Sequence, residues 1–127
     1  MTEVLLEHVN MTVSDPDRTA SMLRDLFGWR VRWSGGSKAG GYSVHVGTGA
    51  RYVALYRPSG AVAEPGDSYS RAGAVNHIGV LVEDLAAAEA RVLEHGIKTH
   101  SHQTYDPGSR FYLHDADGIE YEVVSYA

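Results

Sequence analysis

Two histidines and one glutamate stand at positions where they could bind a metal ion together. His8 lies in LEHVNMTV (residues 6–13), His77 lies in NHIGVLV (residues 76–82), and Glu122 lies in GIEYEVV near the end of the chain. Imidazole and carboxylate groups suit iron, manganese, zinc or nickel, and a two-histidine, one-carboxylate site leaves neighbouring positions on iron open for substrate and dioxygen. A single strand histidine is ordinarily a hydrogen-bonded core or surface residue. The metal hypothesis therefore depends on the elements that position the three residues.

The two histidines begin two copies of one pattern, 69 positions apart. In both copies apolar residues recur at every second position after the histidine, which indicates a strand with one buried face. A helix should follow, with Asp15 as N-cap, Pro16 at its first position and Gly28 at its end. Asp84 and Gly96 take the cap and end positions in the second copy. The side chains expected to face the core are Ala20, Leu23 and Phe27 in the first helix, and Leu85, Ala88 and Val92 in the second.

Three strand-like runs follow each expected helix. They are WRVRW, YSVHVG and RYVALY in the first copy, and IKTHSH, SRFYLH and IEYEVVSY in the second. Residues 58–73 between the copies are rich in Pro, Gly and Ser, which is typical of a linker. The sequence therefore predicts an α+β fold of two βαβββ modules in one domain, 1–127, with module 1 at about 3–57 and module 2 at about 74–127.

The end of the second copy places the glutamate on the same kind of face as the histidines. The second helical segment is one residue shorter, so the later parts of the copies are offset by 68, and Glu122 corresponds to Ala54. Tyr121 and Val123 supply the apolar face that a helix-covered sheet needs. Glu122 then lies on the uncovered face, as both histidines would.

Composition narrows the class of protein. The chain has 127 residues, 43% of them hydrophobic and 21% charged, which is enough for one domain with its own core. It has no cysteine, so disulfides, thiolate ligands and cysteine nucleophiles are excluded. A net charge of −5 without a basic cluster argues against nucleic acid and anionic membranes as partners. With neither a signal-like start nor an apolar run of about 20 residues, a cytoplasmic location is expected.

Three stretches of the chain resemble the vicinal oxygen chelate superfamily of glyoxalase, bleomycin-resistance, fosfomycin-resistance and extradiol dioxygenase proteins. They are EHVNMTVSDPDRTASMLRDLFGWRV, NHIGVLVEDLAAAEARVLEHGI and FYLHDADGIEYEV, and the similarity covers essentially the whole chain. It implies a cupped mixed sheet around a divalent metal ion, with helices on the outer face, a small-molecule substrate and a homodimer. Ligands usually come from the first and last strands of each module, here His8, Ala54, His77 and Glu122.

Ala54 favours some branches of the family over others, because glyoxalase I enzymes usually have a glutamate or glutamine there. A glyoxalase-like lyase or isomerase is thus less favoured. Extradiol dioxygenases need only the other three ligands, and the resemblance implies Fe²⁺ or Mn²⁺, with Zn²⁺ or Ni²⁺ as alternatives. Their tyrosine before the metal glutamate corresponds to Tyr112, which would steady developing charge. Their upstream histidine falls near His102, one residue from the expected spacing, as a catalytic acid or base.

Two other functions stay open. A fosfomycin-resistance thiol transferase also fits Tyr112, although the family threonine two residues after the first histidine is Asn10 here. A metal-free protein of the bleomycin-resistance kind would sequester an aromatic or cationic drug, which the negative charge would favour. Retention of both histidines and the glutamate favours the metal-dependent enzyme, with an extradiol-type dioxygenase as the best prediction.

Four residues are candidates for binding substrate. Asn10 lies on the polar face of the first strand. Tyr52 and Tyr56 flank Ala54 and could stack on an aromatic substrate or cover the core. Arg110 shares strand parity with Tyr112 and could bind an anion or face solvent.

For the remaining histidines and for Glu120, the sequence predicts positions outside the metal-ligand set. His100 and His102 should alternate on one strand face, as acid–base candidates or as exposed polar residues. His45 and His95 are predicted to be ordinary surface residues, and Glu120 should lie at the cavity mouth or in solvent. Residues 34–41, SGGSKAGG, predict a flexible hairpin connection.

Overall fold

The computed structural model describes residues 2–105 and 107–127. The chain forms two compact units, Met1–Ala63 and Glu64–Ala127, and their boundary falls inside the segment that the sequence predicts as a linker. Each unit has the order βαβββ and contains one four-stranded mixed sheet and one α-helix. The α+β fold of two βαβββ modules is therefore confirmed.

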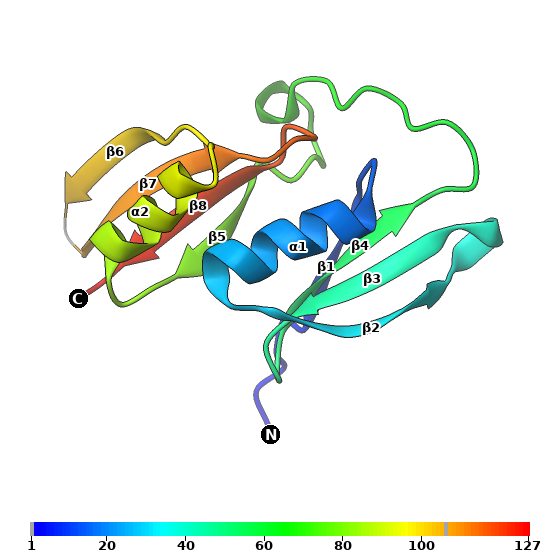
Figure 1. The fold of residues 1–127 in the computed structure, drawn as a ribbon, viewed down its shortest axis with the longest axis horizontal. Coiled ribbons are helices and arrows are strands. Elements are labelled where there is room, and N and C mark those ends of the chain that lie inside the picture. Colours follow the sequence, from blue (N-terminus) through cyan, green and yellow to red (C-terminus); the bar gives the residue numbers. More distant parts are fainter. Residues whose placement is uncertain (1, 106) are drawn as a thin grey trace. The chain divides into compact units, whose positions relative to one another are not determined.

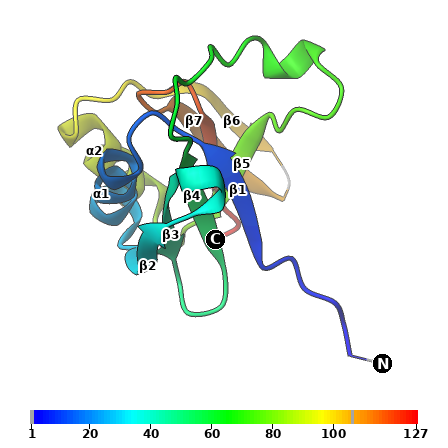
Figure 2. The same cartoon turned by 90° about the vertical axis from the view of Figure 1, so that its right-hand side faces the viewer.

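The first unit is built around the sheet order β1-β4-β3-β2, in which β1 and β4 are parallel and the other neighbours antiparallel. Helix α1 lies against one face of this sheet, over β3 and β4 (Figures 1 and 2). The elements are β1 His8–Thr12, α1 Pro16–Phe27, β2 Arg30–Gly36, a 3₁₀ turn at Lys38–Gly40, β3 Tyr42–Gly47 and β4 Tyr52–Arg57.

The second unit repeats this plan with the sheet order β5-β8-β7-β6 and helix α2 over β7 and β8 (Figure 1). His77 pairs with Glu120 across β5 and β8, as His8 pairs with Tyr52 across β1 and β4. The register therefore confirms the repeat. The elements are a 3₁₀ turn at Ser68–Ser70, β5 His77–Leu81, α2 Leu85–Glu94, β6 His100–Tyr105, β7 Gly108–His114 and β8 Glu120–Ser125.

Both helices begin where the sequence predicts, and they end within two residues of the predicted glycines. The N-cap carboxylates accept a hydrogen bond from the backbone N–H three positions later, at 3.1 Å for Asp15 and 3.0 Å for Asp84. These bonds satisfy one of the donors that the first turn leaves without a helical partner. Gly28, directly after α1, and Gly96, two residues after the end of α2, have φ of 71° and 81°, a left-handed conformation that glycine adopts without a steric penalty.

The apolar strand faces and the helices form the core of each unit, and the opposite sheet faces carry the polar side chains. Ala20, Leu23, Ala88 and Val92 are buried as expected, whereas Phe27 is only half-buried and Leu26 takes its place in the core. The buried strand side chains include Val44, Val46 and Leu55 in the first unit, and Phe111, Leu113, Tyr121 and Val123 in the second. In the part of the chain that the structure describes, no helix has the length and hydrophobicity needed to span a bilayer.

A β-bulge overturns one expectation about strand faces. Strand β6 begins at His100, three residues later than the predicted run, and its pairing with β7 shifts between His100 and Gln103. Ser101 has φ of 56°, which turns the chain at this point. His100 and His102 consequently lie on different faces. His100 stacks on Tyr112, whereas His102 contacts helix α2.

Two connecting segments are more ordered than predicted. Strand β2 extends to Gly36, into the expected hairpin connection of residues 34–41, and the rest of that connection contains the first 3₁₀ turn. The segment between β4 and β5, drawn in green in Figure 2, contains the second turn, Ser68–Ser70. Asp67 caps that turn by accepting a hydrogen bond from the backbone N–H of Tyr69 at 3.0 Å.

Candidate functional site

The uncovered sheet face of the second unit gathers chemically active side chains from all four strands. The register places Glu122 between Gly79 of β5 and Tyr112 of β7, and Glu120 between His77 and His114. Adjacent strands lie roughly 4.8 Å apart, so these side chains are within reach of one another. The set on this face comprises His77, His100, Arg110, Tyr112, His114, Glu120 and Glu122.

Glu122 uses its two carboxylate oxygens for different partners. Oε1 lies 3.0 Å from Nε2 of His77, and Oε2 accepts a hydrogen bond from Nη1 of Arg110 at 2.6 Å. The Glu122 and Arg110 side chains are only 13% and 12% exposed. A charge-assisted bond of this length in a mostly buried place fixes the carboxylate, with Oε1 directed at the imidazole.

Tyr69 and Glu120 contact the Nδ1 side of the His77 ring. The Tyr69 hydroxyl donates to Oε1 of Glu120 and lies 3.4 Å from Nδ1 of His77. A hydroxyl that donates to Glu120 still has lone pairs, so it can also accept a hydrogen bond from the Nδ1 side of His77. Glu120 also lies 3.8 Å from Nδ1. The hydrogen bond to Glu120 raises the pKa of Tyr69 to about 12, so the hydroxyl stays protonated at neutral pH.

The other ring nitrogen of His77 faces a carboxylate oxygen. Nε2 of His77 and Oε1 of Glu122 are 3.0 Å apart, a separation that suits either a hydrogen bond between them or a metal ion bound to both. Ligand atoms about 2.1 Å from one metal ion are themselves roughly 3.0 to 3.4 Å apart, in octahedral and tetrahedral geometry respectively. The two residues thus fit a divalent ion without rearrangement of the strands.

Tyr112 lies beside this pair, as the sequence predicts. Its ring meets the His77 ring edge-on, with 5.7 Å between centroids and an interplanar angle of 86°. The His100 ring also stacks on the Tyr112 ring, with 6.1 Å between centroids. His102 is elsewhere: its Nε2 lies 2.6 Å from Oε2 of Glu89 on helix α2. The hydrogen bond from His102, followed by that from Thr99, lowers the pKa of Glu89 below its usual range.

The sequence did not point to two of the residues that hold His77. Tyr69 comes from the segment predicted as a linker, where no periodic pattern marks it. Glu120 was expected at the cavity mouth or in solvent, but its side chain is 12% exposed and contacts His77, His114 and Tyr69. Its strand parity with Glu122 is the one sequence signal that could have identified it.

In the first unit His8 lies in a group of stacked rings. The Tyr52 ring stacks on His8 at 4.8 Å and on His45 at 4.7 Å, and the Arg32 guanidinium lies 4.4 Å from its centroid. Nδ1 of His8 is 2.8 Å from Oε1 of Glu7. His45 is half-buried, and desolvation, then the His8 and Arg32 charges, lowers its pKa. His45 therefore lies on the sheet surface, where its ring neighbours cover it in part.

The other candidate substrate residues of the first unit have distinct places. Asn10 is exposed on β1 and pairs with Ala54, which is only 2% exposed. Tyr56 is half-buried, and its hydroxyl donates to the backbone carbonyl of Lys38 at 3.1 Å. The roles of His8 as a metal ligand, and of Asn10, Tyr52 and Tyr56 in substrate binding, stay predictions.

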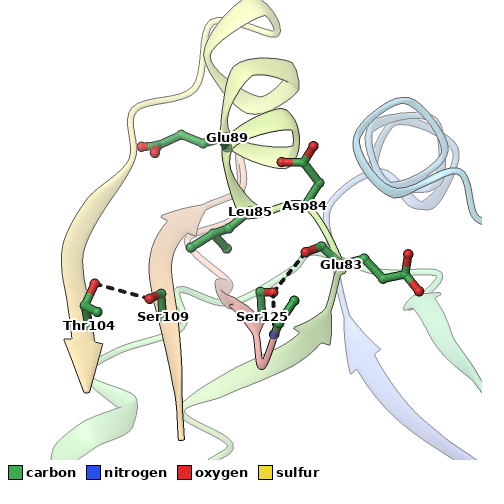
Figure 3. A pocket seen from close by; sticks show the side chains of 9 residues that line it. Glu83, Asp84, Leu85, Glu89, Thr104, Ser109 and Ser125 are labelled. Carbon is green, nitrogen blue, oxygen red and sulfur yellow. Dashed lines mark hydrogen bonds between the residues drawn. The ribbon is translucent and has the colours of Figure 1, made fainter. Parts of the chain in front are cut away.

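A groove on the helix side of the second unit is a separate feature (Figure 3). It has a volume of about 660 Å³ and runs beside the start of helix α2. Thr104 and Ser109 are hydrogen-bonded to each other there, and Ser125 donates to the Glu83 carbonyl. None of the nine residues drawn is a predicted ligand. The lining comprises Glu83, Asp84, Leu85, Ala86, Glu89, Thr104, Ser109, Ser125 and Ala127.

The chain contains two βαβββ modules, and in the second a histidine and a carboxylate meet on the open sheet face. These features place it among proteins built from paired βαβββ modules. The sequence profile of the Glyoxalase/Bleomycin resistance protein/Dioxygenase superfamily matches residues 5–123. The chain is a member of that superfamily. Comparison with curated proteins gives no match.

Solved structures with the same fold share little sequence with this chain. The glyoxalase/bleomycin resistance protein/dioxygenase domain from Frankia sp. EAN1pec is 23% identical, with a TM-score of 0.82 and 98% of each chain covered. The glyoxalase family protein from Enterococcus faecalis is 18% identical, with a TM-score of 0.73 and 96% of each chain covered. The fosfomycin resistance protein FosX from Listeria monocytogenes, complexed with Mn(II) and sulfate, is 18% identical, with a TM-score of 0.71 and 98% of this chain and 93% of that chain covered.

Proposed function

We propose that this protein is a metal-dependent enzyme whose small substrate binds the metal ion through oxygen atoms. His77 and Glu122 are the ligands of the second unit. The observation that carries the proposal is the 3.0 Å separation of His77 Nε2 and Glu122 Oε1 on the open sheet face, which is the spacing of two ligands of one metal ion. The family resemblance makes His8 the third ligand, a prediction that His8→Ala tests by metal titration.

Fe²⁺ or Mn²⁺ is the proposed ion, with Zn²⁺ or Ni²⁺ as alternatives. Mixed imidazole and carboxylate donors suit all four metals, and metal affinity rises from Mn²⁺ toward Ni²⁺. The structurally similar FosX was solved with Mn(II), which supports a manganese site of this kind. When bound, the ion would polarise substrate oxygens and, as iron, would offer positions for substrate and dioxygen.

The protein's own side chains would orient the ligands. Arg110 holds Glu122 by its Oε2 atom and leaves Oε1 for the metal, so we assign Arg110 a positioning role in place of direct anion binding. Tyr69 and Glu120 hold the Nδ1 side of His77, which keeps Nε2 available. Partners of this kind typically change metal affinity by roughly 10- to 100-fold.

Tyr112 and a histidine are the candidates for proton transfer on this face. The Tyr112 ring lies against His77, where its hydroxyl would steady negative charge on a bound substrate. We assign the acid–base role to His100 and not to His102, because His100 stacks on Tyr112 whereas His102 bonds Glu89 of helix α2. The bulge at Ser101 explains the one-residue departure from the family spacing.

An extradiol-type dioxygenase remains the proposed reaction class, with a catechol as the substrate type. The tyrosine beside the histidine–glutamate pair supports it. Oxygen uptake with a panel of catechols, after anaerobic loading with Fe²⁺, tests this assignment. The second candidate is a fosfomycin-resistance activity, which the similarity to FosX favours. Loss of an epoxyphosphonate in the presence of Mn²⁺, without oxygen uptake, would establish the second candidate instead.

Calorimetric titration of tag-free protein with Mn²⁺ tests the metal site itself. Glu122→Ala should abolish binding at this site, whereas Glu94→Ala, which removes an exposed carboxylate at the end of helix α2, should not. Equal Mn²⁺ binding by both variants would place the metal elsewhere. Absence of metal uptake by the wild type would instead favour the metal-free drug-binding protein. A cytoplasmic location and a homodimer remain proposals from the sequence.

A further inference from the structure

A second cluster of metal-binding side chains lies on the open face of the second unit, nearer the β6 edge. His100 of β6, His114 of β7 and Glu120 of β8 each offer one ligand atom, and these atoms lie within 4.8 Å of one another. Nε2 of His100 is 3.1 Å from Nδ1 of His114, and Nε2 of His114 is 3.4 Å from Oε2 of Glu120. The two imidazole rings are nearly parallel, with an angle of 12°.

The register of three neighbouring strands brings these residues together. His114 pairs directly with Glu120 across β7 and β8. His100 pairs with Tyr112, two residues before His114, so its ring is diagonal to His114 on the same face. The bulge at Ser101 is what turns His100 to this face. The cluster is therefore set by strand geometry, which holds ligands more rigidly than a loop.

Short contacts join the members of the cluster in a row. Oγ of Ser101 lies 2.8 Å from Nδ1 of His100, and Nε2 of His114 faces Oε2 of Glu120 at 3.4 Å. Between them, Nε2 of His100 and Nδ1 of His114 are 3.1 Å apart. That separation is the one expected for two nitrogens bound to the same metal ion, at about 3.0 to 3.4 Å.

We propose that His100, His114 and Glu120 bind a second divalent cation, with Zn²⁺ preferred over Mn²⁺. Two imidazoles and one carboxylate form a ligand set typical of zinc. The His114 side chain is 49% exposed, so its ring can turn to bring one nitrogen to the ion without repacking the core. The carboxylates of Glu120 and Glu122 also favour a cation on this face. The site goes beyond the proposed function, because it uses neither His77 nor Glu122 as a ligand. It shares His100 with the proposed proton transfer, so bound Zn²⁺ would take that histidine out of catalysis, whereas Glu120 would bind through Oε2 and keep Oε1 for Tyr69.

Zinc titration against a chromophoric chelator tests the proposal, with tag-free protein and three matched histidine variants. His100→Gln and His114→Gln should each remove one bound Zn²⁺ per chain. The affinity for that ion should fall by more than about 100-fold, because residues that only orient a metal ligand already contribute roughly 10- to 100-fold. His102→Gln, which changes an exposed histidine outside the cluster, should keep that ion. Unchanged Zn²⁺ stoichiometry and affinity in His100→Gln and His114→Gln would overturn the proposal.

Two further measurements separate this site from the proposed catalytic one and from misfolding. His114→Gln should keep Mn²⁺ binding, and Glu122→Ala should keep Zn²⁺ binding at the cluster, so either site can fail alone. In wild-type protein, NMR of histidine rings labelled with ¹⁵N should show the His100 and His114 nitrogens shifting with Zn²⁺. Ring signals of both residues that stay unchanged at saturating Zn²⁺ would overturn the proposal without any variant.

Discussion

The ion pair between Arg110 and Glu122 provides a quantitative test of the site's electrostatics. The two groups are 2.6 Å apart, and their side chains are 12% and 13% exposed. Two charges about 4 Å apart, centre to centre, attract by roughly 4 kcal/mol at an effective dielectric constant of 20. Removing one partner of a fully buried pair costs about 3–5 kcal/mol. Allowing for residual exposure, we expect Arg110→Met and Glu122→Gln each to lower the free energy of unfolding by about 2–3 kcal/mol.

A double-mutant cycle measured by urea denaturation gives the coupling directly. The double variant Arg110→Met/Glu122→Gln should be more stable than the sum of the single effects by about 2 kcal/mol, because it leaves no uncompensated charge. For a chain of this size each single variant should lower Tm by roughly 10 °C. Asp25→Asn is the matched control, since the Arg24–Asp25 pair is 63% and 45% exposed and should contribute less than about 1 kcal/mol. Additive effects, or single effects as small as the control, would refute the reasoning.

Three further predictions concern other parts of the chain. Tyr69→Phe removes the hydroxyl between His77 and Glu120, so the Mn²⁺ affinity measured by calorimetry should fall by roughly 10-fold. An unchanged affinity would mean that the hydroxyl does not hold His77. The lowered pKa of His45 means that the unfolded chain binds its proton more readily, so stability should fall as pH drops below the ordinary histidine value. Melting curves should show less of this acid loss in His45→Gln. Asp84→Ala removes the N-cap bond of helix α2 and should cost about 1 kcal/mol in denaturation, with no effect on metal binding.

Local sequence signals predicted the elements because local interactions determine them. The capping aspartates and the terminal glycines of both helices act within a few residues, and they fixed α1 and α2 to within one or two residues. The repeat also gave the correct correspondence of Glu122 with Ala54, because each residue occupies the third position of the last strand of its module. Strand parity then placed Tyr112 and Arg110 beside Glu122.

What the sequence could not supply depends on deviations from regular geometry and on contacts between distant residues. A single left-handed residue, Ser101, exchanged the faces of His100 and His102, and no residue type at that position marks a bulge. Tyr69 reaches Glu120 across 51 positions of sequence. The partial burial of His45 follows from stacking on Tyr52, which is its diagonal neighbour because His45 pairs with Ala54 and Gly47 pairs with Tyr52 across β3 and β4.

The central claim is that His77 and Glu122 share one divalent metal ion. Anomalous X-ray diffraction from crystals grown with Mn²⁺ tests it most directly, because the manganese signal locates the ion without reference to the protein. We expect an anomalous peak roughly 2.0 to 2.3 Å from both Nε2 of His77 and Oε1 of Glu122. A manganese peak away from these two atoms, or none at saturating Mn²⁺, would contradict the account.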